Sequence, residues 1–199
     1  MKKNKRIAII GGAFNPPHMG HALVIETITR LFLCNEIWVM PSADRRDKKI
    51  NVSGKQRLEM LKIMINDLFV NSAIPIRIST IELDRDKPTT TYETNQELTQ
   101  RYPNNRFYYV IGSELVGDIE KKWYRGKELW SRLNFVVILR GLSKLPKKLP
   151  SQVMILDEDI CLADVSSTFL RQLIKSGYSG LPYITKGVAE YIQKNKLYR

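Results

Sequence analysis

The sequence predicts an α/β protein with a doubly wound parallel sheet that helices cover on both faces. Short apolar runs, rich in β-branched and aromatic residues, alternate with helical patterns along the chain. The runs are nearly continuous in apolar residues, which is typical of parallel strands buried on both faces. With 199 residues and 43% hydrophobic content, the chain is long enough for one sizeable core and short for two. We therefore expect a single domain over residues 1–199.

Six segments have the composition of strands: 6–10, 37–41, 76–82, 106–111, 134–139 and, more weakly, 152–156. Helices are expected between them. Two of these helices begin with a capping box, in which Ser or Thr is followed three residues later by Gln or Glu. Ser53 with Gln56 opens the helix 53–70, and Thr90 with Glu93 opens the helix 91–102.

Polar segments follow three of these strands, at 11–21, 42–51 and 112–114. In a doubly wound sheet, ligands bind at the carboxyl ends of the strands, where the strand order reverses. We therefore expect the three segments to converge on one site.

Both histidines of the chain lie in the first of these segments, Gly11-Gly12-Ala13-Phe14-Asn15-Pro16-Pro17-His18-Met19-Gly20-His21. The two glycines let the backbone approach a ligand closely, and a helix start near 17–20 offers unpaired N–H groups to an anion. His18 and His21 share one helix face and could both donate to phosphoryl oxygens. The alternative is two surface histidines beside an ordinary turn. We favour the phosphate site because the whole histidine content follows the Gly-Gly turn.

A second helix start with anion-binding character lies near the end of the chain, at Ser166-Ser167-Thr168-Phe169-Leu170-Arg171. Ser166 is a good N-cap, and the hydroxyl and backbone donors after it suit an anion. A cation near a helix N-terminus opposes the helix dipole, so Arg171 is best explained by a bound anion. An ordinary cap with Arg171 in solvent is an equally open reading of this segment taken alone.

The formal net charge of +12 predicts attraction for anions such as nucleotides, nucleic acids or acidic membranes, although a solvated basic surface has the same composition. Aromatic residues do not interleave with the basic clusters, as a single-strand binder would require.

Cys34 and Cys161 have no metal or disulfide spacing, and we expect reduced, buried thiols. No apolar stretch reaches membrane-spanning length, so we expect a cytoplasmic protein without a membrane partner.

The segment 11–21 resembles the signature of bacterial nicotinate mononucleotide adenylyltransferases, within the nucleotidyltransferases that carry a His-x-Gly-His motif. The segment 166–171 resembles the second signature of that family, Ser-Ser-Thr-x-x-Arg. Residues 53–61, Gly112, Trp123 and the ending 191–198 extend the likeness over nearly the whole chain. The resemblance implies a Rossmann-like domain that joins ATP and nicotinate mononucleotide into a dinucleotide with release of pyrophosphate, a step of NAD biosynthesis.

The residues and the resemblance together assign roles to three groups of side chains. The catalytic group comprises His18, His21, Lys48 and Arg171. The ATP group comprises Gly11, Gly12, Ala13, Phe14, Gly20, Gly112, Glu114, Ser166, Ser167 and Thr168. The mononucleotide group comprises Asn15, Thr91, Thr94 and Trp123. For Thr94 and Trp123, packing is the alternative role. Mg²⁺ is expected to bind through the ATP phosphates, and the chain shows no spacing for a protein metal site.

Four departures from the family pattern concern the substrate pocket: Ala13 for Ser or Thr, Thr90 for Tyr, 45–48 for Pro-Pro-His-Lys, and Glu114 for Asp. They leave open whether the acid or the amide mononucleotide fits best. Two other functions are alternatives: transfer to a different phosphate acceptor such as phosphopantetheine, and a basic nucleic-acid-binding relative without activity. The sequence leaves the oligomeric state open, a homo-oligomer included.

Overall fold

The computed structural model describes residues 4–43, 52–85, 87, 89–139, 145–146 and 148–199. Its strands are β1 (Arg6–Gly12), β2 (Glu36–Pro41), β3 (Ile76–Ile78), β4 (Arg106–Gly112), β5 (Asn134–Ile138) and β6 (Val153–Leu156). Its helices are α1 (Met19–Leu31), α2 (Gly54–Leu68), α3 (Thr91–Arg101), α4 (Ser113–Lys122), α5 (Gly126–Arg132), α6 (Ser167–Lys175) and α7 (Lys186–Lys194). Both expected capping boxes are present, with Ser53 and Thr90 as the N-caps of α2 and α3.

The strands form one six-stranded sheet in the order β3-β2-β1-β4-β5-β6. Every pair of neighbours is parallel. The chain therefore builds the sheet outward from β1 in one direction and then from β4 in the other. This confirms the predicted doubly wound, Rossmann-like fold and places the reversal of strand order between β1 and β4.

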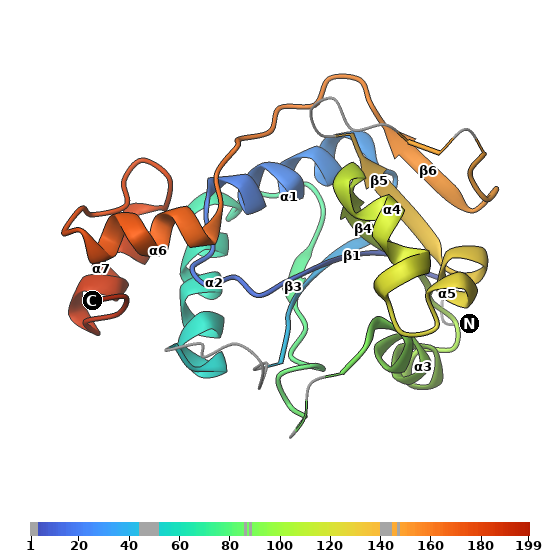
Figure 1. Cartoon of the computed structure of the whole chain (residues 1–199), viewed down its shortest axis with the longest axis horizontal. Helices are drawn as coiled ribbons and strands as arrows, with labels where there is room; N and C mark the ends of the chain where they lie inside the picture. The colour runs from blue at the N-terminus through green and yellow to red at the C-terminus, as the bar shows by residue number, and fades with distance from the viewer. Residues whose placement is uncertain (1–3, 44–51, 86, 88, 140–144, 147) are drawn as a thin grey trace.

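Alternate residues of the four central strands, β1, β2, β4 and β5, enter two separate cores, one on each face of the sheet. Ala8 and Ile10 of β1 pack in the core beneath α1, α2, α6 and α7. Ile7 and Ile9 pack in the core beneath α3, α4 and α5. Figure 1 shows the helices divided between the two faces of the sheet. Because both faces of these central strands are buried, they are largely apolar, which is the pattern that made them recognisable in the sequence.

Strand β3 is shorter than predicted, because it ends at Ile78 and the chain turns rather than continuing to residue 82. It is an edge strand that pairs only with β2, as far as Val39. Beyond that point the Thr80 carbonyl accepts a hydrogen bond from the Asp84 backbone and Ile81 folds into the core beneath α3. The apolar residues at 76–81 thus serve a strand and then a packed turn.

The two cysteines differ in their surroundings. Cys34 is buried, as expected, and packs in the core beneath α1. Cys161 is exposed, which corrects the prediction of a buried thiol. It lies in the segment between β6 and α6, outside both cores. This segment has no helical or strand periodicity from which the exposure of a side chain could be predicted.

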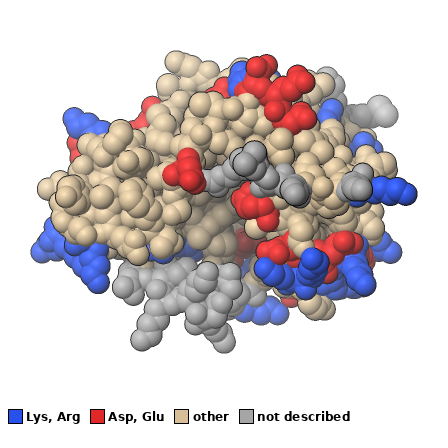
Figure 2. All heavy atoms as spheres, turned by 45° about the horizontal axis from the view of Figure 1, so that its top comes forward, with Lys and Arg blue, Asp and Glu red and all other residues tan. Residues whose placement is uncertain are grey.

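Basic side chains do not form one continuous surface on the face shown in Figure 2. The described Lys and Arg residues gather in separate groups toward the rim of this face, and acidic side chains lie beside the hollow near its centre. Many of the basic residues pair with acidic neighbours one turn away on the same helix, as Lys122 does with Asp118 and Arg132 with Glu128. No helix among the described residues is long and apolar enough to cross a membrane.

Candidate active site

Two cavities meet at the carboxyl edge of the sheet, on either side of the end of β1. The first has a volume of about 370 Å³, and the second of about 630 Å³. They share four lining residues, Gly11, Val110, Ile111 and Leu115. The shared residues belong to β1, β4 and the start of α4, so the junction lies at the reversal of strand order. Two ligands in these cavities would therefore touch beside Gly11.

His18 and His21 both line the first cavity. His18 is the N-cap of α1, and the two ring centroids are 3.8 Å apart. The backbone N–H of His18 donates a hydrogen bond to Nδ1 of His21 at 3.2 Å. Because Nδ1 accepts, a neutral His21 ring carries its proton on Nε2 and offers that N–H as a donor. Phe14 is buried against the His21 ring, with centroids 4.7 Å apart, and fixes the orientation of the ring.

Gly20 has no side chain, and the His18 ring packs against its Cα. A Cβ at this position would lie 3.0 Å from both Cε1 and Nδ1 of His18 and 3.3 Å from Val165. We expect Gly20→Ala to displace the imidazole and to lower kcat/KM for ATP about tenfold to a hundredfold, the cost of a displacement of about 1 Å in a catalytic group.

The matched control for this variant is Gly117→Ala, because a Cβ at Gly117 on α4 meets no atom within 4 Å. This control should keep full activity and gain a little stability, since alanine favours a helix over glycine by about 0.5–1 kcal/mol. Equal kcat/KM values for the two variants would contradict the role of Gly20. Steady-state kinetics with varied ATP measures both.

Helix α6 begins at the same cavity. Ser166 caps the helix by accepting a hydrogen bond from the backbone of Phe169 at 3.2 Å, and Ser167 donates from Oγ to the Pro16 carbonyl at 2.9 Å. Both serines line the first cavity together with Gly112 and Glu114 at the start of α4. Helices α1, α4 and α6 thus direct their N-terminal ends toward one space, which favours a polyanion there.

Arg171 and Asn15 lie behind the wall of the first cavity rather than in it. Arg171 donates to the carbonyl of Asn15 at 2.9 Å and to Oγ1 of Thr168 at 3.1 Å. The side chain of Asn15 is buried and accepts a hydrogen bond from the Tyr198 hydroxyl at 2.6 Å. Neither Asn15, Thr168 nor Arg171 lines either cavity. In this structure, the three residues join the histidine loop to α6 and to the C-terminal segment.

The second cavity contains most of the residues assigned to the mononucleotide. Thr91, Thr94 and Trp123 line it, together with Gly12 and Ala13 from the end of β1. Thr94 is buried, and its hydroxyl donates to Oε1 of Glu82 at 2.9 Å. Glu82 also lines this cavity, a position to which the sequence assigned no role.

Arg57 is another functional residue that the sequence analysis missed. It is fully buried on α2, and its guanidinium donates to the carbonyls of Ala13 at 2.5 Å and Ser42 at 2.7 Å. These carbonyls belong to the loops after β1 and β2, which Arg57 therefore ties together. The signal in the sequence was the position of Arg57 on the apolar face of an amphipathic helix. Arginine is rarely buried without partners, so an arginine on that face indicates buried hydrogen-bond acceptors nearby.

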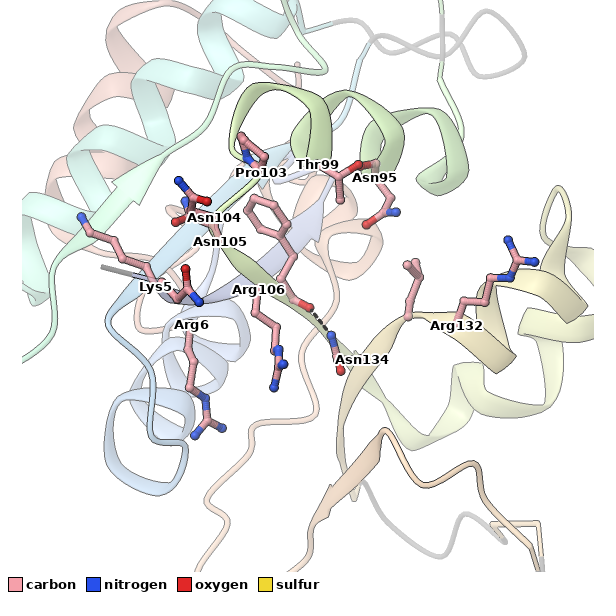
Figure 3. A pocket seen from close by; sticks show the side chains of 13 residues that line it. Lys5, Arg6, Asn95, Thr99, Pro103, Asn104, Asn105, Arg106, Arg132 and Asn134 are labelled. Carbon is pink, nitrogen blue, oxygen red and sulfur yellow. Dashed lines mark hydrogen bonds between the residues drawn. The ribbon is translucent and has the colours of Figure 1, made fainter. Parts of the chain in front are cut away.

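A third cavity, of about 720 Å³, lies at the opposite edge of the sheet, where β1, β4 and β5 begin. Its lining includes Lys5, Arg6, Arg106 and Arg132, so its charge alone would suit an anion. Figure 3 shows, however, that these side chains diverge: Arg6 and Arg106 extend to one side, and Lys5 and Arg132 point away in two other directions. Helix α5 ends at Arg132, where a cation stabilises the carbonyl end of a helix. We therefore place the site at the carboxyl edge.

Lys48, which the sequence analysis placed in the catalytic group, lies outside the described residues, as do the departures at 45–48. Among the described residues, no three His, Cys, Asp or Glu side chains form a group that could hold a metal ion.

Comparisons with known proteins show the family and the fold of the chain. Residues 9–173 match the model of the cytidylyltransferase-like family. The chain is 32% identical to a probable nicotinate-nucleotide adenylyltransferase of Lactiplantibacillus plantarum, over 98% of this chain and 89% of the relative. It is 31% identical to the nicotinate-nucleotide adenylyltransferase of Bacillus subtilis, over 98% of each chain.

Among solved structures, the Plasmodium falciparum nicotinic acid mononucleotide adenylyltransferase complexed with NaAD superposes with a TM-score of 0.84. That protein is 28% identical, and the match covers 98% of both chains. Its complex with APC superposes with a TM-score of 0.80. On the strength of the family match, the identity over nearly the full length and the shared fold, this chain belongs to the nicotinate-nucleotide adenylyltransferases of the cytidylyltransferase-like family.

Proposed function

We propose that this protein transfers the adenylyl group of ATP to nicotinate mononucleotide, forming the deamido-NAD dinucleotide and pyrophosphate. The observation that carries the proposal is the pair of cavities that share a wall at Gly11, Val110, Ile111 and Leu115. The cavity with the two histidines and three helix starts suits the triphosphate. The cavity with Trp123 and the threonines suits the mononucleotide.

The reaction is an in-line attack by a 5′-phosphate oxygen of the mononucleotide on the α-phosphorus of ATP. The new P–O bond forms as the bond to the β-phosphate oxygen breaks, and pyrophosphate leaves. Phosphate oxygens are nucleophilic at neutral pH, so the protein needs to position two anions and stabilise the charge that develops. The Nε2–H of His21 and the N-terminal ends of α1 and α6 supply donors for this purpose.

Magnesium is part of this proposal. It binds nucleotide phosphates and water in preference to a cage of protein side chains, and it would reduce the charge of the triphosphate. The described acidic cluster at 157–159 is exposed, away from the cavities, and we give it no metal role.

The proposed activity is tested by incubating the protein with ATP, Mg²⁺ and one acceptor at a time, and by measuring pyrophosphate and product. We expect the dinucleotide from nicotinate mononucleotide, with less from nicotinamide mononucleotide and none from phosphopantetheine. Failure to form product with either pyridine mononucleotide would remove the proposal. A chelator should abolish turnover if magnesium has the proposed role.

Arg171→Ala should raise the KM for ATP more than the KM for the mononucleotide. Arg171 holds the Asn15 carbonyl and borders the serine cap of α6, so its loss loosens the wall of the first cavity. Initial-rate kinetics with each substrate varied in turn measures the two constants. An equal rise in both would contradict the division of the site into an ATP half and a mononucleotide half.

A nucleic-acid-binding protein that has lost catalysis is the alternative from a different class. It would need a continuous basic surface, and the face in Figure 2 shows separate groups of Lys and Arg instead. ATP-independent binding of DNA or RNA that weakens steeply with salt would favour this alternative. The cytoplasmic location and the oligomeric state stay predictions of the sequence.

A further inference from the structure

The second cavity contains a single formally charged side chain among its described lining residues, the carboxylate of Glu82. The other described lining residues are formally uncharged: glycines, aliphatic and aromatic residues, a methionine, a serine and threonines. A negative charge is unexpected here, because the proposed occupant carries a phosphate and a carboxylate.

Among the described residues, no Lys or Arg forms an ion pair with Glu82. Its Oε1 accepts a hydrogen bond from the Thr94 hydroxyl at 2.9 Å. The nearby guanidinium of Arg85 forms an ion pair with Glu97 and donates to Thr94 rather than to Glu82. Thr94 therefore orients the carboxylate, while Arg85 makes its direct contacts with Glu97 and Thr94.

Burial makes this arrangement costly. It raises the pKa of the Glu82 carboxyl above the usual range for glutamate, while the Thr94 hydroxyl and the Arg85 charge act in the opposite direction. From β4, the Tyr109 hydroxyl faces the same region and donates to Asn95 Oδ1 at 3.0 Å. A partly buried carboxylate whose printed hydrogen bond comes from a neutral hydroxyl is stabilised by a ligand that brings a positive charge.

Nicotinate mononucleotide brings such a charge in its ring. The ring nitrogen is bonded to the ribose, so the ring is a pyridinium ion at every pH. Trp123 lines the same cavity, and an aromatic face attracts a ring cation. Resting on the proposed function, we propose that Glu82 determines specificity for the mononucleotide by pairing its carboxylate with the pyridinium charge, with Trp123 against the ring. The phosphate then lies toward the junction at Gly11, and the ring carboxylate lies on the side away from Glu82.

The test compares nicotinate mononucleotide with a matched neutral-ring probe, the C-riboside 5′-phosphate in which a 3-carboxyphenyl ring replaces the pyridinium ring. The two molecules share phosphate, ribose and carboxylate and differ in ring charge. Calorimetry should show that the wild type binds the pyridinium compound more tightly than the probe. In Glu82→Gln this preference should fall about tenfold, because the carboxamide keeps the size and the acceptor oxygen but loses the charge.

An unchanged preference in Glu82→Gln would overturn the proposal, and so would tighter binding of nicotinate mononucleotide, which would place Glu82 beside the carboxylate of the substrate. Asp84→Asn is the matched control: it removes a carboxylate from the same turn that lies outside the cavity, and it should leave the preference intact. Because calorimetry measures binding without turnover, it tests the role of Glu82 separately from the proposed enzymatic activity. A wild type that binds with the expected preference but forms no dinucleotide would refute the activity alone.

A second readout uses pH. As the pH falls through the pKa of Glu82, the carboxylate takes up a proton and the preference of the wild type for the pyridinium ring should decline toward that of Glu82→Gln. Over the pH range in which the ring carboxylates of both ligands stay ionised, the variant should show a constant preference, since the phosphate titrates equally in both ligands. A wild-type preference that does not change with pH, or an equal change in the variant, would contradict the role of the Glu82 charge. Thermal melting of each variant confirms that it is folded under the conditions used.

Discussion

Replacing His21 with alanine should lower kcat at least a hundredfold while the protein stays folded. The ring lines the first cavity, its Nδ1 is held by the His18 backbone, and its Nε2–H is the donor that would meet a phosphoryl oxygen of ATP. Loss of one donor to the charge that develops in a transition state typically costs about a hundredfold to a thousandfold in rate. Single-turnover measurements of dinucleotide formation would isolate this step.

The controls for His21→Ala separate catalysis from structure. Nicotinate mononucleotide should bind the variant normally, because His21 does not line the second cavity. His21→Asn should recover part of the rate, since its amide offers a shorter N–H donor. A kcat within a few-fold of the wild type in the alanine variant would show that His21 is not the donor and would leave the helix N-termini as the main anion site.

Replacing Arg57 with methionine should destabilise the fold by about 3 kcal/mol. The carbonyls of Ala13 and Ser42 would lose their guanidinium donor at a fully buried position, and a buried polar group left without its partner costs about 1–3 kcal/mol. Methionine keeps most of the apolar volume, so the loss of donors dominates. Urea unfolding should show a lower midpoint with an unchanged slope.

Lys62→Met is the matched control, because Lys62 lies on the same helix, is exposed and forms a surface ion pair with Glu59. We expect a change within about 0.5 kcal/mol. Arg57→Lys should recover little stability, since one ammonium on a single stem does not span both carbonyls as a planar guanidinium does. The folded fraction of Arg57→Met should also show a raised KM for the mononucleotide, because Ala13 and Ser42 border the second cavity. Equal stability of the Arg57 and Lys62 variants would exclude the proposed tie between the two loops.

The sequence predicted which residues line the cavity at the strand ends better than it predicted which residues contact one another there. His18, His21, Ser166 and Ser167 line one cavity, as two separated signatures indicated. Arg171 shows the limit of this reasoning. Its place near a helix start pointed to a bound anion, but its direction depends on the Asn15 carbonyl, which is 156 positions away in the chain. Tyr198 contacts Asn15 across an even longer separation, of 183 positions.

The sequence by itself determined the class of fold, the elements and the chemistry of the two signatures. These depend on local properties: apolar runs, capping residues, glycines before a helix start and two neighbouring imidazoles. The tertiary structure alone decided where β3 ends, that Arg57 joins two loops, and that Glu82 faces the second cavity. The reason is that hydrogen bonds and charges act over a few ångströms in space, and a residue's partners there are set by how the sheet orders its strands rather than by the residues beside it in the chain.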